Sequence, residues 1–190
     1  MPVPLKIDFV SDISCPWCVI GLRALEQAIA RLDGQVAVDL HFQPFELNPQ
    51  MPPGGQDIDE HLQQKYGSTP EQAALVRERI RAAGAALGFT FSLQTRSRIY
   101  NTFDAHRLLH WAALEGRQLA RKQALFQAYF TDGEDPSSHQ VLIRAAARVG
   151  LDATRAARIL DSNEFAAVVR KEQSFFLDQG IHAVPAVIIN

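Results

Sequence analysis

The stretch Ser14-Cys15-Pro16-Trp17-Cys18 contains both cysteines of this 190-residue chain, two residues apart and just before an amphipathic segment. Two thiols at this spacing are typical of a redox-active dithiol. A helix that starts at Pro16 places its positive N-terminal end at Cys15, which lowers the pKa of that thiol. Cys18 lies one turn later and is the first residue of an apolar stripe. We therefore predict Cys15 as the exposed attacking thiol and Cys18 as the buried resolving thiol.

Two other uses of a cysteine pair are weaker explanations. A zinc site needs further ligands, but the chain has no other cysteine and its six histidines are scattered. A structural disulfide across two residues restrains the unfolded chain little. The sequence therefore predicts no metal site, and it favours a disulfide only as the oxidised state of a catalytic pair.

Composition narrows the class of protein further. The formal net charge of −2 and the lack of a basic cluster argue against a nucleic-acid partner. The apolar runs are much shorter than the roughly 20 residues of a membrane span. The N-terminus has no signal-peptide pattern, so we expect a cytoplasmic protein, in which a CxxC pair is catalytic or binds metal.

The order of predicted elements indicates an α/β fold. Leu5, Ile7 and Phe9 alternate with polar residues as in a strand, and the apolar stripe that begins at Cys18 predicts a helix ending near Gly34. Alternation over 36–42 predicts a second strand, parallel to the first because a helix connects them. A turn-rich stretch over 44–55 precedes a helical block, and strand character returns at 186–189. Helices are predicted over 70–87, 101–116, 117–130, 138–149, 153–161 and 163–179.

A second motif, Val184-Pro185, places a proline directly before the last apolar strand, where proline is tolerated on structural grounds alone. Combined with the helix-initial CxxC, it resembles the thioredoxin superfamily, in which this proline is cis and packs against the dithiol. The helical block resembles that of the DsbA-like family, and particularly its FrnE-like branch. The motifs that carry this likeness are Ser11-Asp12, Cys15 to Cys18, Pro44 to Pro49, Asn101-Thr102, Ala105 to Leu108, Leu125 to Phe130 and Val184-Pro185.

The resemblance implies a thioredoxin-like fold with a large inserted all-helical domain. Residues 1–55 and 178–190 would form the thioredoxin-like domain, and residues 56–177 the insertion. Family members usually continue with another strand and a helix, so the C-terminal part of this domain is expected to be shortened. An uncovered sheet edge invites association, and a homodimer is one expected result.

The resemblance also assigns site residues. Cys15 and Cys18 take the nucleophile and resolving roles, and Val184 and Pro185 form the substrate-facing loop. An acid beneath the dithiol often relays protons in this superfamily; Asp8 and Asp12 are both candidates, and the choice stays open. His106 is equally well explained as an interior histidine. The substrate-binding residues implied are Pro16, Trp17, Val184, Pro185, Asn101 and His106, the last two at the helical wall of the cleft.

The function implied is that of a cytoplasmic thiol–disulfide oxidoreductase, which passes through a mixed disulfide with a protein or small-molecule substrate. It would hold no bound cofactor and would use glutathione or a dithiol reductant as redox partner. The alternative is a glutathione-dependent enzyme similar to kappa-class transferases and 2-hydroxychromene-2-carboxylate isomerases, in polyketide metabolism. Those enzymes have a serine where Cys15 stands. A third class is a chaperone-like binding module, in which the thiols matter little.

Overall fold

The computed structural model describes residues 2–92 and 96–190. Its larger sheet has three strands. The strand order is β2-β1-β5. β1 (Val3–Ser11) pairs in parallel with β2 (Val36–Pro44) and antiparallel with β5 (Ala186–Ile189). The predicted β-α-β opening and the strand return after the proline loop are therefore confirmed.

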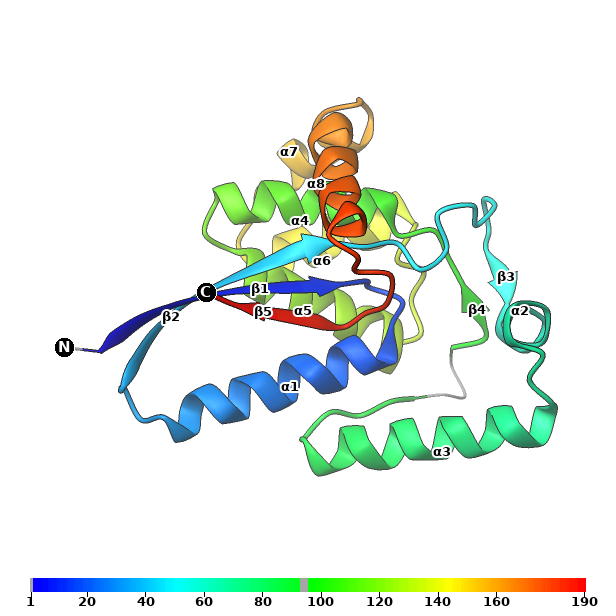
Figure 1. The fold of residues 1–190 in the computed structure, drawn as a ribbon. Coiled ribbons are helices and arrows are strands. Elements are labelled where there is room, and N and C mark those ends of the chain that lie inside the picture. The colour runs from blue at the N-terminus through cyan, green and yellow to red at the C-terminus, as the bar shows by residue number, and fades with distance from the viewer. Residues whose placement is uncertain (1, 93–95) are drawn as a thin grey trace.

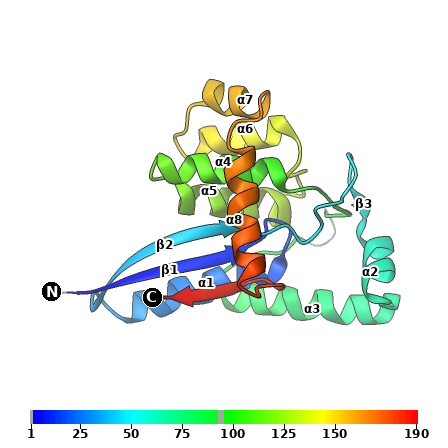
Figure 2. The same ribbon diagram turned by 45° about the horizontal axis from the view of Figure 1, so that its top comes forward.

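One helix covers each face of this sheet (Figure 1, Figure 2). α1 (Pro16–Arg31) packs on one face, where Phe9 shares an apolar cluster with Cys18 and Leu22. α8 (Ala166–Asp178) lies on the other face, where Val10 packs with Phe176. Because neighbouring residues of a strand point to opposite faces, Phe9 and Val10 serve the two different cores.

The segment between β2 and β5 is mainly helical, as predicted, but not entirely so. Two short strands in it pair antiparallel, which corrects the expectation of an all-helical insertion. A helix over Ile58–Tyr66 was also not predicted. The elements in chain order are β3 (Gln56–Asp57), α2 (Ile58–Tyr66), α3 (Pro70–Ala86), β4 (Arg98–Ile99), α4 (Phe103–Leu114), α5 (Gln118–Phe126), the π-helix η1 (Gln127–Thr131), α6 (His139–Arg148) and α7 (Ala153–Leu160).

Local sequence explains where several of these helices begin. Thr69 and Gln72 form the predicted capping box, with Pro70 in the first turn of α3. The unpredicted α2 has its own signals, because the Asp57 carboxylate accepts from two first-turn amides and Gly67 ends the helix in a left-handed conformation. Within the described residues, no helix is long and apolar enough to span a membrane.

A glutamine joins the helical segment to the outer edge of the sheet. The Gln118 side chain, at the start of α5, accepts from the Phe42 backbone N–H and donates to the Phe42 carbonyl, each at 2.9 Å. A side-chain amide thereby takes the place that a neighbouring strand would occupy beside β2. This contact sets α5 against the sheet, close to the dithiol.

Candidate active site

Cys15 is the N-cap residue of α1, and Pro16 occupies the first turn, as expected. The residue is only 3% exposed and Cys18 is fully buried, so the expectation of an exposed Cys15 is wrong. The proline loop is the reason, because the Val184 carbonyl lies 3.7 Å from the Cys15 Sγ and accepts its hydrogen bond. Both cysteines are free thiols in this structure.

The two thiols differ in the direction in which their surroundings shift their pKa. A hydrogen bond from the Cys18 side chain lowers the pKa of Cys15 despite burial, and the backbone amides of Cys18 and Trp17 at the helix start add to this effect. Burial and the neighbouring Cys15 raise the pKa of Cys18 well above its ordinary value. At neutral pH the pair is therefore arranged with Cys15 as the more readily formed thiolate and Cys18 as the proton-bearing partner.

The Val184–Pro185 peptide bond is cis, as the resemblance implies. Pro185 packs closely on α1 at Gly21, where an added Cβ would come within 3.1 Å of the Pro185 ring and 3.5 Å of the Phe9 ring. Only a residue without a side chain fits there without displacing the loop. No pattern in the sequence predicts this role of Gly21, which lets two segments far apart in the chain meet at the dithiol.

A cleft of about 920 Å³ opens beside Cys15. Trp17, 40% exposed, and the 182–184 segment line it on the thioredoxin-like side. The segment after β2, α2, α3 and part of the 96–99 segment also line it, and the lining includes both cations, among them Lys65 and Arg77, and the acids Asp57 and Asp59. Pro16, Trp17 and Val184 all line this cleft, and their role in substrate binding stays a prediction.

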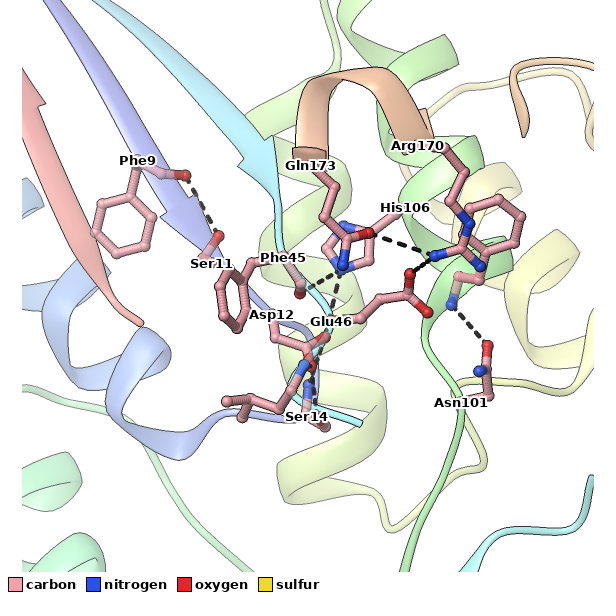
Figure 3. Close-up of polar contacts among 12 residues, drawn as sticks. Phe9, Ser11, Asp12, Ser14, Phe45, Glu46, Asn101, His106, Arg170 and Gln173 are labelled. Carbon is pink, nitrogen blue, oxygen red and sulfur yellow. Dashed lines mark hydrogen bonds and ion pairs between the residues drawn. The ribbon is translucent and has the colours of Figure 1, made fainter. Parts of the chain in front are cut away.

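Asp12 is buried and bonds to three segments of the chain around the dithiol (Figure 3). Its carboxylate accepts from the Ser14 hydroxyl at 2.9 Å and from the Leu47 amide at 2.8 Å, and it lies 3.3 Å from the His106 Nε2. Burial opposes ionisation, but hydrogen bonds and the charge of His106 lower the pKa of Asp12 to about 2. Asp12 therefore stays ionised at neutral pH and cannot serve as the proton-carrying acid.

Asp8, the other candidate acid, belongs to a different environment. Its carboxylate pairs with Lys6 at 3.0 Å and accepts from Gln43 at 2.7 Å. Asp8 alternates with Phe9 along β1, so it points to the sheet face opposite the dithiol. Neither acid fits the proton-relay role.

His106 and Asn101 do not line the cleft, which corrects their expected place at its wall. His106 is 3% exposed, and its Nε2 is shared between Asp12 and the Phe45 carbonyl at 3.1 Å. Because both neighbours are acceptors, this nitrogen carries a hydrogen. Asn101 instead accepts from the Phe103 amide at 2.9 Å and caps the first turn of α4. His106 therefore joins α4 to the segments around the dithiol, whereas the contact of Asn101 is local to the start of α4.

A second ion pair, between a buried glutamate and a half-exposed arginine, lies beside Asp12 (Figure 3). Arg170, from α8, forms an ion pair with Glu46, whose side chain is 1% exposed. The Arg170 guanidinium also lies 3.7 Å from the centre of the Phe103 ring. Burial raises the pKa of Glu46, and the Arg170 charge partly offsets this. Glu46 follows β2 within the Pro44–Pro49 motif, so this contact ties α8 to the segment that lines the cleft.

A buried lysine near the dithiol was not anticipated. Lys122 in α5 is fully buried, and its Nζ has no hydrogen-bond partner in the described part of the chain. Burial lowers the pKa of Lys122 to about 8, and the negative charges of Cys18, Asp12 and Cys15 partly oppose this shift. In the sequence, Lys122 stands one helical turn after Gln118 and one turn before Phe126. This spacing does not indicate whether the lysine is buried or exposed.

The profile of the DSBA-like thioredoxin domain family matches residues 6–190, nearly the whole chain. This chain therefore belongs to the DsbA-like thioredoxin family. A solved structure from Streptomyces coelicolor, described as a probable DsbA oxidoreductase, is 31% identical, with a TM-score of 0.87 over 97% of this chain and 80% of the other. The dithiol, the cis-proline loop and the helical insertion thus occur together in a fold used by thiol–disulfide oxidoreductases.

Two more distant structures share the fold alone. A 2-hydroxychromene-2-carboxylate isomerase is 12% identical, with a TM-score of 0.73 over 96% of this chain and 84% of the other. The cytosolic disulfide reductase DsbM from Pseudomonas aeruginosa, solved with GSH, is 18% identical, with a TM-score of 0.66 over 96% of this chain and 84% of the other. The family fold therefore accommodates different chemistries, and the residues of the site must distinguish them.

Proposed function

We propose that this protein is a cytoplasmic thiol–disulfide oxidoreductase that cycles the Cys15–Cys18 pair between dithiol and disulfide. The observation that carries the proposal is the asymmetry of the pair. Cys15 lines a large cleft and has a lowered pKa, whereas Cys18 lies behind it, fully buried, with a raised pKa. A nucleophile that meets substrate and a partner that only resolves the intermediate need this arrangement.

The reaction follows from the positions of the two sulfurs. The Cys15 thiolate attacks one sulfur of a substrate disulfide, and the other substrate sulfur leaves as a thiol. Cys18 then loses its proton and attacks Cys15, which closes the Cys15–Cys18 disulfide and releases the second substrate thiol. The substrate gains two electrons and the protein loses two. The Val184 carbonyl, at the cis-proline loop, is placed to bond the backbone of an extended substrate at Cys15.

The cleft supports a thiol-bearing peptide, including glutathione, as substrate or electron donor. Its wall combines the apolar Trp17, which can hold an aliphatic or aromatic group, with the cationic Lys65, which can hold a carboxylate. Arg77 on the same wall is already paired with Asp59. Lys65 is kept in place by the Leu47 carbonyl at 2.8 Å and the Asn48 side chain at 2.7 Å.

A trapping experiment tests the proposal. The Cys18→Ser variant, mixed with a disulfide substrate such as oxidised glutathione, should accumulate a mixed disulfide on Cys15 that mass spectrometry detects. The Cys15→Ser variant should not, although it keeps the other thiol. If the wild-type protein neither reduces insulin nor forms the Cys15–Cys18 disulfide under an oxidised glutathione buffer, the proposal fails.

The glutathione-dependent isomerase predicts a different outcome for the same variants. A serine can replace Cys15 in that chemistry, so Cys15→Ser should retain isomerase activity with 2-hydroxychromene-2-carboxylate and glutathione. Under the oxidoreductase proposal, Cys15→Ser loses all disulfide reduction and the wild type shows no isomerase activity.

A further inference from the structure

Arg96 lines the same cleft as Cys15, and its guanidinium packs on two aromatic rings there. The central carbon of the guanidinium lies 4.9 Å from the centre of the Tyr129 ring and 4.9 Å from that of Phe130. The two ring centres are 4.7 Å apart, and both side chains are buried. They belong to the apolar cluster that also contains Cys15 and Cys18. The Arg96 head group therefore packs on side chains that also surround the dithiol.

The rings under Arg96 are fixed in place. The Tyr129 hydroxyl donates to the Arg98 carbonyl at 2.9 Å, which ties η1 to β4 two residues after Arg96. Burial raises the pKa of Tyr129, and the charge of Arg96, with a hydrogen bond from it, partly opposes this rise. An arginine whose planar face lies on aromatic rings keeps N–H edges with which it can bind a planar anion. Because the side chain is already ordered, a bound anion would cost little further conformational entropy.

The acidic side chains that line the cleft are engaged with other groups. Their partners are Arg170 for Glu46, Arg77 for Asp59, and two backbone amides at the start of α2 for Asp57. Within residues 2–92 and 96–190, no carboxylate pairs with Arg96, and its buried Nε has no hydrogen-bond partner. A cation without a counter-charge in a partly enclosed cleft attracts an anion. Arg96 therefore offers a positive charge that the protein itself leaves unmatched.

We propose that Arg96 is a specificity-determining residue that binds a carboxylate of the substrate, an inference that rests on the proposed oxidoreductase function. The substrate class is then a small acidic disulfide or thiol, whose sulfur meets Cys15 while its carboxylate meets Arg96. The guanidinium donates N–H groups to the carboxylate and transfers no proton, so the exchange at sulfur is unchanged. Lys65, bonded only to neutral oxygens of residues 47 and 48, is a second cation on this cleft for a substrate with two carboxylates.

The rate at which Cys15 attacks disulfides of different charge tests the proposal. In the Cys18→Ser background only the first step of the exchange occurs, so the second-order rate constant of mixed-disulfide formation reports recognition of the substrate. The three disulfides are oxidised glutathione, which is anionic, bis(2-hydroxyethyl) disulfide, which is neutral, and cystamine, which is cationic. Mass spectrometry of acid-quenched samples follows each reaction.

Three substitutions in this background separate the role of Arg96 from that of charge alone. Arg96→Met removes the guanidinium and keeps an unbranched apolar side chain over the two rings. Arg77→Met is the matched control, because it also removes one arginine charge from the cleft, but that arginine is already paired with Asp59. Arg96→Lys keeps the charge and loses the planar, bidentate head group. Arg96→Gln repeats the test if Arg96→Met does not show a folding transition in a urea titration.

In Arg96→Met, we expect the rate constant for oxidised glutathione to fall by about tenfold or more, which is the effect of one lost charge-assisted hydrogen bond. The rate constant for the neutral disulfide should stay unchanged, which shows that Cys15 is as reactive as before, and that for cystamine should not fall. Arg96→Lys should give an intermediate rate with oxidised glutathione. Arg77→Met should change all three rates little, as for other exposed ion pairs.

Other results separate this proposal from the one on which it rests. An unchanged rate with oxidised glutathione in Arg96→Met overturns the role of Arg96 and leaves the oxidoreductase function standing. Equal slowing in Arg77→Met also overturns it, because the loss would then come from the net charge of the cleft. Equal slowing with the neutral disulfide does the same, because Arg96 would then act only through packing around the dithiol. If the Cys18→Ser parent forms no mixed disulfide with any of the three compounds, the oxidoreductase function itself fails.

Discussion

The imidazole of His106 and the carboxylate of Asp12 lie 3.3 Å apart inside the protein, with their side chains 2% and 1% exposed. The two residues are 94 positions apart in the chain. Asp12 precedes the dithiol and His106 belongs to α4, so this contact joins the thioredoxin-like part to the helical segment directly beneath the active-site loop.

We predict that His106→Leu destabilises the protein by about 3 to 5 kcal/mol, because it leaves a buried carboxylate without one of its partners. Urea denaturation measures the change. The His139–Asp104 pair, at 3.2 Å with the histidine side chain 47% exposed, is the matched control. His139→Leu should cost at most about 1 kcal/mol, as for other exposed pairs. Similar losses in the two variants would show that burial of the pair does not matter.

Acid should remove the contribution of Asp12 to stability. The pKa of its carboxyl is about 2 in the folded protein against 3.8 ordinarily, so the folded state favours the ionised form. This stabilisation, roughly 2 kcal/mol, is present above pH 4 and is lost as the pH falls from about 4 toward 2. Urea titrations across this range measure it. Asp12→Asn should show a shallower loss over the same interval, and an identical slope would contradict the assignment.

The two thiols should react with an alkylating agent in a fixed order. With iodoacetamide at neutral pH, Cys15 should be modified first because its pKa is lowered, whereas the pKa of Cys18 is raised by burial. Peptide mass spectrometry over a time course identifies the site. In the Cys15→Ser variant, Cys18 should stay largely unmodified until the pH is well above neutral. Prior labelling of Cys18 in the wild type would reverse the assigned roles.

Gly84→Ala should destabilise the protein by about 1 to 3 kcal/mol through overpacking. A Cβ at Gly84 would lie 2.5 Å from the Phe91 ring and 3.0 Å from the Phe89 carbonyl. Without that clash, alanine would stabilise the interior of α3 by about 1 kcal/mol, so the two explanations predict opposite signs. Thermal or urea unfolding decides between them. The exposed neighbour gives the control, because Ala85→Gly should cost only the ordinary helix-propensity difference.

Local patterns predicted the parts of the fold that depend on neighbouring residues. The alternation around Phe9 and the stripe from Cys18 to Leu22 report which side of a strand or helix is buried, and both are confirmed in the core beneath α1. The helix α2 was missed because Ile58 and Leu62 give it too short an apolar stripe. Its cap at Asp57 was the available signal.

These local patterns could not predict contacts between residues that are far apart in the chain. The burial of Cys15 depends on a carbonyl 169 residues away, and no periodicity near Cys15 reports it. The cleft position expected for His106 was wrong for the same reason, because Asp12 and Phe45 both draw its ring inward. Lys122 looked like an exposed lysine, because the sequence does not reveal which face of α5 packs on the sheet.

The double hydrogen bond between Gln118 and Phe42 has a consequence for self-association. An open strand edge offers N–H and C=O groups on which another chain can add a strand, which is a common route to aggregation. At Phe42, both backbone groups are already taken by one amide side chain. The helical segment therefore blocks the addition of another strand to β2 at Phe42. Replacing Gln118 with a residue that cannot bond both groups would expose a template for intermolecular pairing, even though the dithiol itself would be untouched.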